Sequence, residues 1–268
     1  MKQKILILSI FITAIHFNTI AQKNSNSPAQ VDSDKKRLLY SWTFSESNPL
    51  HDLAELTPDV TVVEDPLDPS NKVMQCVLPN GEYRTEASVG AKSPHYFYAD
   101  SIDSAHGDEI WVGFRLLKFN EPFSGTNTNV SIFQIGPVHN IYFPKNGKGH
   151  YQLRLSTTTD KWKLREFESM CDPNTCNDDI SAVNYGQWDR FVFHCKFKSD
   201  NTGVFEIWRN DVKIYSATRQ NGVKNARTRV KWGIYLGAGN TEHETLKCYF
   251  DDVKIGGSNA NYDVVVPR

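Results

Sequence analysis

The sequence predicts an all-β protein in which two antiparallel sheets pack face to face. Short segments of alternating apolar and polar residues recur from about residue 38 to residue 255, separated by Gly, Pro, Asn and Asp. No long segment shows the periodicity of a helix. Strands with one apolar face bury that face against another sheet, so many such strands indicate a sandwich. Aromatic residues form 12% of the chain, enough to fill its core.

The N-terminal segment predicts export. Lys2 and Lys4 precede an apolar run over residues 5–20, and Ala21 offers a small residue for cleavage. This pattern is typical of a secretory signal peptide, so we assign residues 1–21 to a signal and expect a secreted protein. A membrane anchor is the alternative, but the apolar run is short for a membrane span.

The remainder of the chain is expected to form one domain behind a leader. Residues 22–37 are polar and rich in Ser, Asn, Asp and Lys, which predicts a flexible leader. Residues 38–268 contain neither a repeat nor an internal linker, which favours a single sandwich domain. Within it, Val204–Tyr215 predicts a hairpin that turns at Asn210 and Asp211.

Alternation is clearest in three segments, residues 151–156, 191–198 and 231–236. In the second of these, Phe and Cys occupy one face while His and Lys occupy the other. Each segment predicts a strand with one buried and one solvated face. The formal net charge is −1, so an anionic partner would need a local cluster of Lys and Arg. We expect a monomer that binds neither nucleic acid nor membrane.

The mature chain contains five Cys residues, and an exported protein can keep disulfides. Cys171 and Cys176 enclose a short loop that contains Pro, which predicts a disulfide between them. An odd number of Cys leaves at least one thiol unpaired in a single chain. The sequence leaves the partners of Cys76, Cys195 and Cys248 open. No second Cys or His pair has the spacing of a zinc site.

The first candidate site segment is residues 83–88, in which alternation puts Arg84, Glu86 and Ser88 on one face. A Glu beside an Arg can hold the guanidinium rigid, and a rigid guanidinium suits bidentate capture of a sugar carboxylate. A purely structural ion pair is the alternative, and this strand taken alone favours it.

Two further strands carry polar residues that a sandwich core does not require. Gln134 interrupts an apolar strand, where a structural, hydrogen-bonded Gln is the alternative. Lys231 and Tyr235 share a face, and Gly233 between them is expected to leave a gap for a ligand. A Tyr beside a cation suits proton transfer. A surface Tyr packed over the Lys stem is the alternative.

In their order and chemistry, the three strands resemble the motif strands of jelly-roll polysaccharide lyases, the group of alginate, heparin and glucuronan lyases. The matching segments are Arg84-Thr-Glu-Ala87, Gln134-Ile-Gly136 and Lys231-Trp-Gly-Ile-Tyr-Leu-Gly237. Gly186–Phe197 and Phe250–Gly256 are similar to the wider group as well. The resemblance covers roughly residues 38 to 256, and it is greatest to the small secreted ulvan lyases, polysaccharide lyase family twenty-eight.

This resemblance implies a concanavalin-like β jelly roll with a concave groove for an anionic, uronic-acid-containing polysaccharide. It implies cleavage by β-elimination, which leaves a 4,5-unsaturated uronate and requires no cofactor. Ulvan, with its bonds between sulfated rhamnose and uronate, is the expected substrate. Glucuronan, alginate and heparin-type polymers are alternative substrates, and a non-catalytic carbohydrate-binding module is an alternative function. A laminarinase-type hydrolase is disfavoured because the chain lacks a Glu-Xaa-Asp-Xaa-Xaa-Glu strand with its close carboxylates.

The resemblance also implies roles for individual residues. Arg84 and Gln134 are expected to neutralise the substrate carboxylate, and Tyr235 to protonate the leaving oxygen. Their neighbours on the same strands, and basic residues of other strands, are expected to contact the substrate. These substrate-binding candidates are Glu86, Arg154, Lys163, Arg165 and Lys231.

The general base is less certain from the sequence, because the His of the family motif Gln-Ile-His is replaced by Gly136. Lys118, on the strand before Gln134, is our candidate, since burial among cations lowers the pKa of a Lys. His139 and His150 are alternatives. In some related lyases the Tyr performs both proton transfers.

A structural calcium ion is a further expectation from the resemblance. Asp251 and Asp252 lie on a late strand, where related jelly rolls tie their termini with a hard cation on oxygen ligands. Two solvated carboxylates are the alternative.

Overall fold

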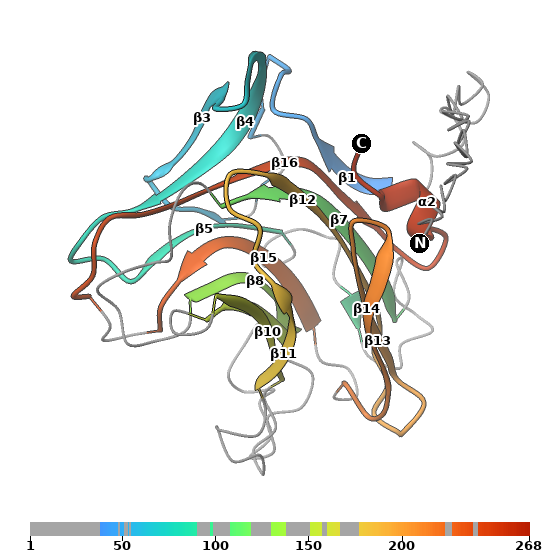
Figure 1. The fold of residues 1–268 in the computed structure, drawn as a ribbon. Helices are drawn as coiled ribbons and strands as arrows, with labels where there is room; N and C mark the ends of the chain where they lie inside the picture. Colours follow the sequence, from blue (N-terminus) through green and yellow to red (C-terminus); the bar gives the residue numbers. More distant parts are fainter. Residues whose placement is uncertain are drawn as a thin grey trace, which may run out of the picture.

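The computed structural model confirms the predicted all-β sandwich (Figure 1). It describes residues 38–47, 49–50, 53, 55–89, 97–98, 108–118, 130–137, 151–156, 160–166, 177–222, 227–237 and 241–268. Within these residues the strands form two antiparallel sheets of eight strands each, followed by one short helix, α2 at Tyr262–Val265. The same residues contain no helix long and apolar enough to cross a membrane.

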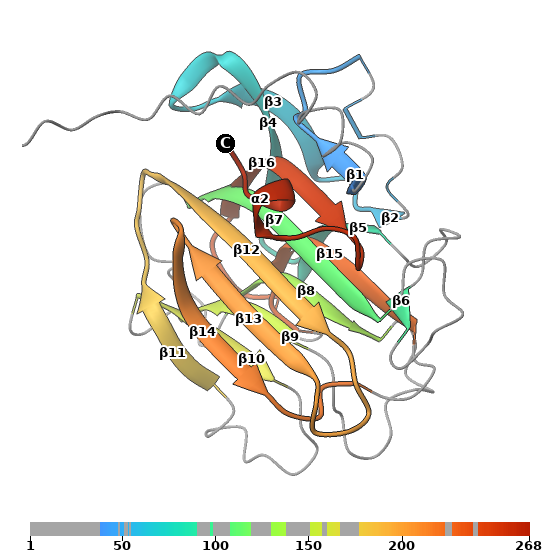
Figure 2. The same ribbon diagram turned by 90° about the vertical axis from the view of Figure 1, so that its right-hand side faces the viewer.

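One sheet, which we call the outer sheet, has the order β14-β13-β12-β7-β16-β4-β3, with β1 paired to β16. In Figure 2 the strands β14, β13, β12, β7 and β16 lie side by side in this order. Its strands are β1 at Leu38–Trp42, β3 at Val60–Asp65, β4 at Asp68–Leu78, β7 at Glu109–Leu117, β12 at Trp188–Lys196, β13 at Val204–Arg209, β14 at Val212–Thr218 and β16 at Leu246–Gly256.

The second sheet, which we call the curved sheet, has the order β11-β10-β9-β8-β15-β5-β2, with β6 paired to β15. Its strands bend around a common axis in Figure 1. They are β2 at Glu55–Leu56, β5 at Arg84–Val89, β6 at Phe97–Tyr98, β8 at Val130–Pro137, β9 at Tyr151–Leu155, β10 at Lys161–Glu166, β11 at Asn177–Ala182 and β15 at Arg227–Tyr235.

The core between the two sheets is largely aromatic. Phe133 of the curved sheet stacks on Phe193 of the outer sheet, with ring centroids 4.3 Å apart, and Phe114 lies 5.2 Å from Phe133. Trp42 of the outer sheet and Trp232 of the curved sheet also meet in this core, with tilted rings whose centroids are 5.5 Å apart. Since alternate residues of each strand enter this core, the residues between them point away from it. The polar residues of the curved sheet are thereby placed on its other face.

The predicted hairpin is confirmed. β13 and β14 pair from Arg209 opposite Val212, so only two residues form the turn. Those residues, Asn210 and Asp211, have φ values of 49° and 70°. Two successive positive φ values are the mark of a type I′ turn, which Asn and Asp tolerate and which matches the twist of the strands.

Candidate active site

Five adjacent strands of the curved sheet, from β5 to β10, each contribute polar side chains to the face that points away from the core. Register pairs align these residues across the sheet: Arg84 lies opposite Tyr235, and Lys231 lies opposite both Ser88 and Gln134. We call this surface the polar face. It comprises Arg84, Glu86, Ser88, Gln134, Gln152, Arg154, Lys163, Arg165, Lys231 and Tyr235.

Glu86 is the hub of the polar face. Its carboxylate lies 2.9 Å from Arg84 Nε and 3.8 Å from Lys231 Nζ, and it accepts a hydrogen bond from the Gln134 amide. The Arg84 contact is an ion pair without the alignment of a hydrogen bond. Burial raises the pKa of Glu86 above its usual value, while the charges of Lys231 and Arg84 oppose that shift. One buried carboxylate thus positions the two cations and the Gln amide.

Gln134 is held in one orientation by a chain of hydrogen bonds. A carboxylate only accepts, so the Gln134 nitrogen must face Glu86. The Gln134 oxygen then accepts from the Gln152 nitrogen at 2.9 Å, and the Gln152 oxygen accepts from the Ser131 hydroxyl at 3.0 Å. All four side chains are buried. The chain of bonds fixes which atoms of Gln134 can meet a ligand.

The sequence argument missed Gln152. It lies two residues before Arg154, on the solvated face of a predicted strand, so alternation placed it correctly but did not single it out. Its importance depends on the register of β9 against β8, which puts Gln152 opposite Gln134. Pairing of strands far apart in sequence is the information that a single sequence lacks.

Tyr235 lies at the end of β15, among three guanidinium groups. The Arg84 guanidinium carbon lies over the Tyr235 ring, 4.5 Å from its centroid, and the Tyr83 ring meets it edge-on at 6.4 Å. Burial and then repulsion from Arg165 lower the pKa of Arg154 to about 10, and attraction to Tyr235 opposes the shift. Burial also lowers the pKa of Arg165, again against attraction to Tyr235. Tyr235 therefore lies in a strongly cationic environment.

Gly233 does not leave a gap for a ligand, contrary to the sequence interpretation. A Cβ at this position would come within 2.2 Å of the Thr85 carbonyl oxygen and 2.7 Å of Glu86 Cα. Gly233 has a φ of 136°, and the register with β8 shifts between Trp232 and Tyr235. The absence of a side chain at Gly233 thus allows the β5 backbone to approach β15 closely at this irregularity in the strand. A small pocket of about 130 Å³ lies beside it, lined by Leu56, Thr57, Arg84, Glu86, Ser88 and Lys231.

The remaining candidates for the base are Lys118 and two His residues, of which the structure describes Lys118. Lys118 directly follows β7 of the outer sheet, is buried, and has its ammonium 5.8 Å from the centroid of the Tyr185 ring. Its carbonyl accepts a hydrogen bond from Gly186, just before β12. The alternative bases His139 and His150 lie outside the described residues. Cys171 and Cys176 lie outside them as well, so their disulfide stays a prediction.

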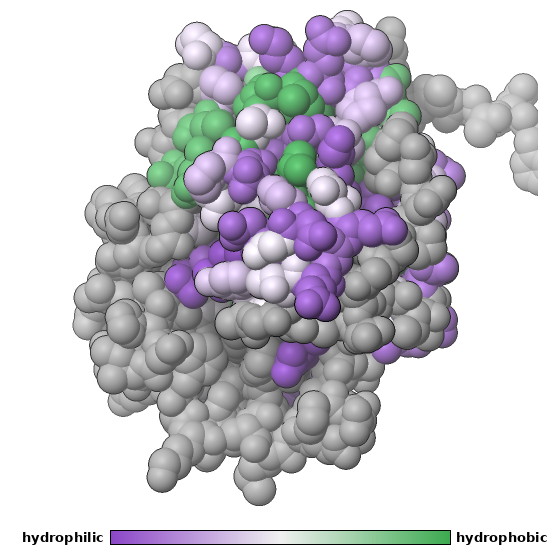
Figure 3. Space-filling model, turned by 90° about the vertical axis from the view of Figure 1, so that its left-hand side faces the viewer, coloured by the Kyte–Doolittle hydropathy of each residue, from purple (hydrophilic) through white to green (hydrophobic). Residues whose placement is uncertain are grey.

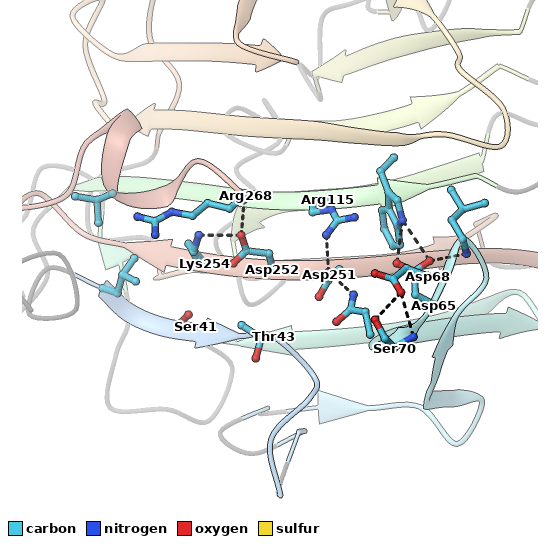
Figure 4. Close-up of a pocket in the computed structure, with 15 residues that line it drawn as sticks. Ser41, Thr43, Asp65, Asp68, Ser70, Arg115, Asp251, Asp252, Lys254 and Arg268 are labelled. Carbon is cyan, nitrogen blue, oxygen red and sulfur yellow. Dashed lines mark hydrogen bonds and ion pairs between the residues drawn. The ribbon is translucent and has the colours of Figure 1, made fainter. Parts of the chain in front are cut away.

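The calcium candidates lie in a different pocket, of about 690 Å³, on the outer sheet (Figure 4). Asp251 accepts from Arg115 at 3.0 Å, and Asp252 accepts from Lys254 at 2.9 Å. Each carboxylate already has a cationic partner, so the pair does not fit a divalent cation in this arrangement. No cluster of three or more His, Cys, Asp or Glu suited to a metal occurs in the described part of the chain.

The polar face and not the larger pocket carries the chemistry expected of a site for an acidic sugar. Its cations are Arg84, Arg154, Lys163, Arg165 and Lys231, whereas the 690 Å³ pocket pairs its Asp251 and Asp252 with Arg115 and Lys254. Figure 3 shows the left-hand side of the molecule in Figure 1, where hydrophilic residues predominate across the middle. A curved sandwich with such a face has the architecture of a carbohydrate-active jelly roll.

Comparison with known proteins identifies the family. A family model described as polysaccharide lyase matches residues 54–254, most of the chain. The protein therefore belongs to the polysaccharide lyases. No curated protein sequence matches it.

Solved structures of two kinds of lyase share the fold. An endo-β-1,4-glucuronan lyase from the fungus Trichoderma reesei superposes with a TM-score of 0.60 at 17% identity, covering 86% of this chain and 98% of that chain. An alginate lyase from Chlorella virus gives 0.54 at 12% identity, covering 82% and 99%. A marine alginate lyase from Aplysia kurodai gives 0.54 at 11%, with the same coverage. At these identities the likeness establishes the fold.

Proposed function

We propose that this polysaccharide lyase cleaves an anionic, uronic-acid-containing polysaccharide by β-elimination on its polar face, and that ulvan is its substrate. The observation that carries the proposal is the convergence of Arg84, Gln134 and Lys231 on the buried Glu86, with Tyr235 packed against Arg84. A cation, a fixed amide and a phenol are the groups that this reaction requires.

The first task is to neutralise the uronate carboxylate, which makes the proton on the neighbouring C5 acidic. Arg84 and Gln134 are suited to it because Glu86 holds both in place. Charge-assisted hydrogen bonds to the carboxylate strengthen as negative charge spreads from C5 onto its oxygens. Preorganised donors of this kind stabilise the transition state more than the ground state.

The second task is proton transfer. The C5–H bond and the C4–O4 bond break, a double bond forms between C4 and C5, and the leaving O4 takes up a proton. Tyr235 is our candidate for the donor. Arg84, Arg154 and Arg165 lie around Tyr235, so its phenol group is close to several cations. In the alternative assignment Tyr235 takes the C5 proton as well as protonating O4, in which case Lys118 is not needed for chemistry.

The choice of ulvan rests on the resemblance of the three motif strands, and the cations beyond Arg84 suit a polymer that carries sulfate as well as carboxylate. Arg154 and Arg165 lie together near Tyr235, where a sulfate of the neighbouring sugar would meet them. Glucuronan is the second candidate, because the glucuronan lyase superposes on this chain with a TM-score of 0.60, against 0.54 for the two alginate lyases. We also propose that the protein is exported after removal of residues 1–21.

A panel of ulvan, glucuronan, alginate and heparin tests the proposal. We expect ultraviolet absorbance of the unsaturated uronate to rise with ulvan and to rise less or not at all with the others. Activity on glucuronan alone would transfer the assignment to that polymer. Binding of a polymer without any unsaturated product would instead identify a carbohydrate-binding module and overturn the enzymatic proposal.

A further inference from the structure

Two cysteines face each other across neighbouring strands of the outer sheet. Cys76 of β4 is the register partner of Cys248 of β16, so the two side chains project from the same side of the sheet. Both are fully buried in the core between the sheets. Both are free thiols in this structure, and each is close enough to the other to affect its ionisation.

The backbone geometry suits a covalent bond. Directly opposed residues of antiparallel strands have Cα atoms roughly 4.5–5.5 Å apart, within the range of about 4.4–6.8 Å that a disulfide spans. Cys195, the third cysteine in the described residues, belongs to β12, and β7 separates that strand from β16. The Cys195 sulfur instead accepts from the Asn221 amide at 3.7 Å. Of these three, only Cys76 and Cys248 are adjacent.

We propose that Cys76 and Cys248 form a site of oxidation that closes into a cross-strand disulfide when the chain folds under oxidising conditions. The oxidant is a small-molecule disulfide such as oxidised glutathione. The thiolate of one cysteine attacks it, forming a mixed disulfide and releasing one glutathione thiol. The second cysteine then attacks the mixed disulfide, which forms the Cys76–Cys248 bond and releases the other glutathione thiol. The two protons of the cysteines end on the two glutathione molecules.

The bond must form during folding and not afterwards. Burial, followed by the interaction with the Cys248 thiol, raises the pKa of Cys76 well above its usual value. Because the thiolate is the attacking species, a thiol with such a pKa and no solvent access exchanges slowly. Before the sheets close over each other, both thiols are accessible. Oxidation therefore depends on the environment in which the chain folds.

The bridge should stabilise the sandwich. It would join strands that are neighbours in space but distant in sequence, so it closes a long loop and restricts the unfolded chain. A long loop of this kind, in a domain of this size, predicts a rise of about 5–15 °C in the temperature of unfolding.

The test uses the full chain, unfolded and reduced, then refolded in a glutathione redox buffer. Free thiols are alkylated without reductant, and the protein is digested with trypsin. We expect Val73–Arg84 and Cys248–Lys254 to appear as one linked species that reduction separates. A Cys195→Ser variant should retain the link, and a Cys248→Ser variant should lose both the link and the gain in unfolding temperature.

In a second experiment, folded and reduced protein is incubated in the same glutathione buffer and only then unfolded and alkylated. We expect both Cys76 and Cys248 to be alkylated. The proposal is overturned if both peptides are alkylated after oxidative refolding, or if Cys76 is linked to another cysteine. If Cys248→Ser does not fold, Cys248→Ala provides the same comparison. Rapid oxidation of the folded protein would contradict the argument from burial.

Discussion

At the scale of residues, the mechanism depends on one hydroxyl. Tyr235→Phe keeps the ring under the Arg84 guanidinium and removes only the oxygen, so the fold should survive. We expect the rate of unsaturated product formation to fall by ~10²–10⁴-fold, the usual effect of losing a general acid or base. Circular dichroism checks the fold. An unchanged rate in a folded variant would refute the role of Tyr235 and leave His139 and His150 as candidates.

Lys118→Met distinguishes the two assignments of the base. Lys118 follows a strand of the outer sheet, and its ammonium lies near Tyr185. If Tyr235 performs both proton transfers, the variant should keep nearly normal kcat. A loss of ~10²-fold or more, with the unfolding temperature unchanged, would establish Lys118 as the base. The Met side chain keeps the length of the Lys stem, so the comparison isolates the charge.

Gln152 should act through the orientation of Gln134. In Gln152→Glu the ionised carboxylate cannot donate to the Gln134 oxygen, so two acceptors would face each other. A buried unsatisfied acceptor costs about 1–3 kcal/mol, so activity at neutral pH should fall roughly 5–150-fold. When acid protonates the new carboxyl, it can donate again, and activity relative to wild type should recover.

Gln152→Met is the matched control, since it cannot donate at any pH. Its deficit relative to wild type should therefore be the same across the pH range. Wild-type activity in Gln152→Glu at neutral pH, or identical pH profiles for the two variants, would show that Gln152 does not position Gln134.

Only part of the candidate site could be predicted from residue patterns within single strands. Alternation within a strand correctly places Arg84 with Glu86, and Lys231 with Tyr235, because that period is local. Glu86 also contacts Lys231 of β15 and Gln134 of β8, and no pattern within a single strand encodes these contacts. Gly233 was misinterpreted for the same reason. The space where its side chain would lie is occupied by the backbone of β5, a strand far away in the sequence.

At the scale of elements, three neighbouring strands of the outer sheet are linked by charged side chains. His194 of β12 contacts Glu206 of β13 through Nδ1 at 2.8 Å and Glu109 of β7 through Nε2 at 2.9 Å. Each carboxylate lies within hydrogen-bonding distance of one ring nitrogen, so the imidazole joins the strands on both sides of it. The imidazole also stacks on Trp111, with centroids 3.9 Å apart.

This arrangement predicts how stability depends on pH. The hydrogen bond from His194 lowers the pKa of Glu109, and bonds from Lys213 and His194 lower that of Glu206 despite its burial. Carboxyls whose folded pKa lies below the unfolded value stabilise the fold above that unfolded value, and the stabilisation is lost as pH falls through the folded pKa. Wild type should therefore lose stability below about pH 4.3.

His194→Gln should remove most of that dependence. At pH 6 the variant should be less stable by about 1–2 kcal/mol, since the charged hydrogen bonds are partly exposed to solvent. Near pH 3 the difference should shrink, because the carboxyls are then protonated in both proteins. Urea unfolding at several pH values measures it, with exposed Lys247→Gln as the control. A difference that does not change with pH would contradict the argument.

Strands and turns could be predicted where the residues that specify them are close together in the sequence. The hairpin turn at Asn210 and Asp211 needed only the residue types and the alternation on each side. The order of strands in each sheet did not follow from the sequence: β5 pairs with β15, which is far away in the chain. In a sandwich most paired strands are far apart in the sequence. The two layers were therefore predicted, but the neighbours of each strand within its sheet were not.

At the scale of the whole molecule, positive and negative charges nearly balance, but they are unevenly distributed over the surface. The formal net charge is −1, yet Arg84, Arg154, Lys163, Arg165 and Lys231 share the polar face, where the buried carboxylate of Glu86 pairs with Arg84 and Lys231. A local cluster of this kind attracts an anionic polymer at short range, and salt screens it over a Debye length of about 10 Å at 0.1 M. Binding of the polymer should accordingly weaken as salt rises.

Charge reversal at two positions separates the local field from the net charge. Arg165→Glu and Lys247→Glu change the net charge equally, but Arg165 lies on the polar face and Lys247 is exposed on β16 of the outer sheet. In a Tyr235→Phe background the bound polymer is not cut, so affinity electrophoresis in ulvan measures binding alone. Arg165→Glu should raise Kd roughly ten-fold or more, equivalent to about 1.4 kcal/mol, and should flatten the dependence on salt. Lys247→Glu should change neither. Equal weakening by both variants would mean that net charge governs binding and that the polar face does not hold the polymer.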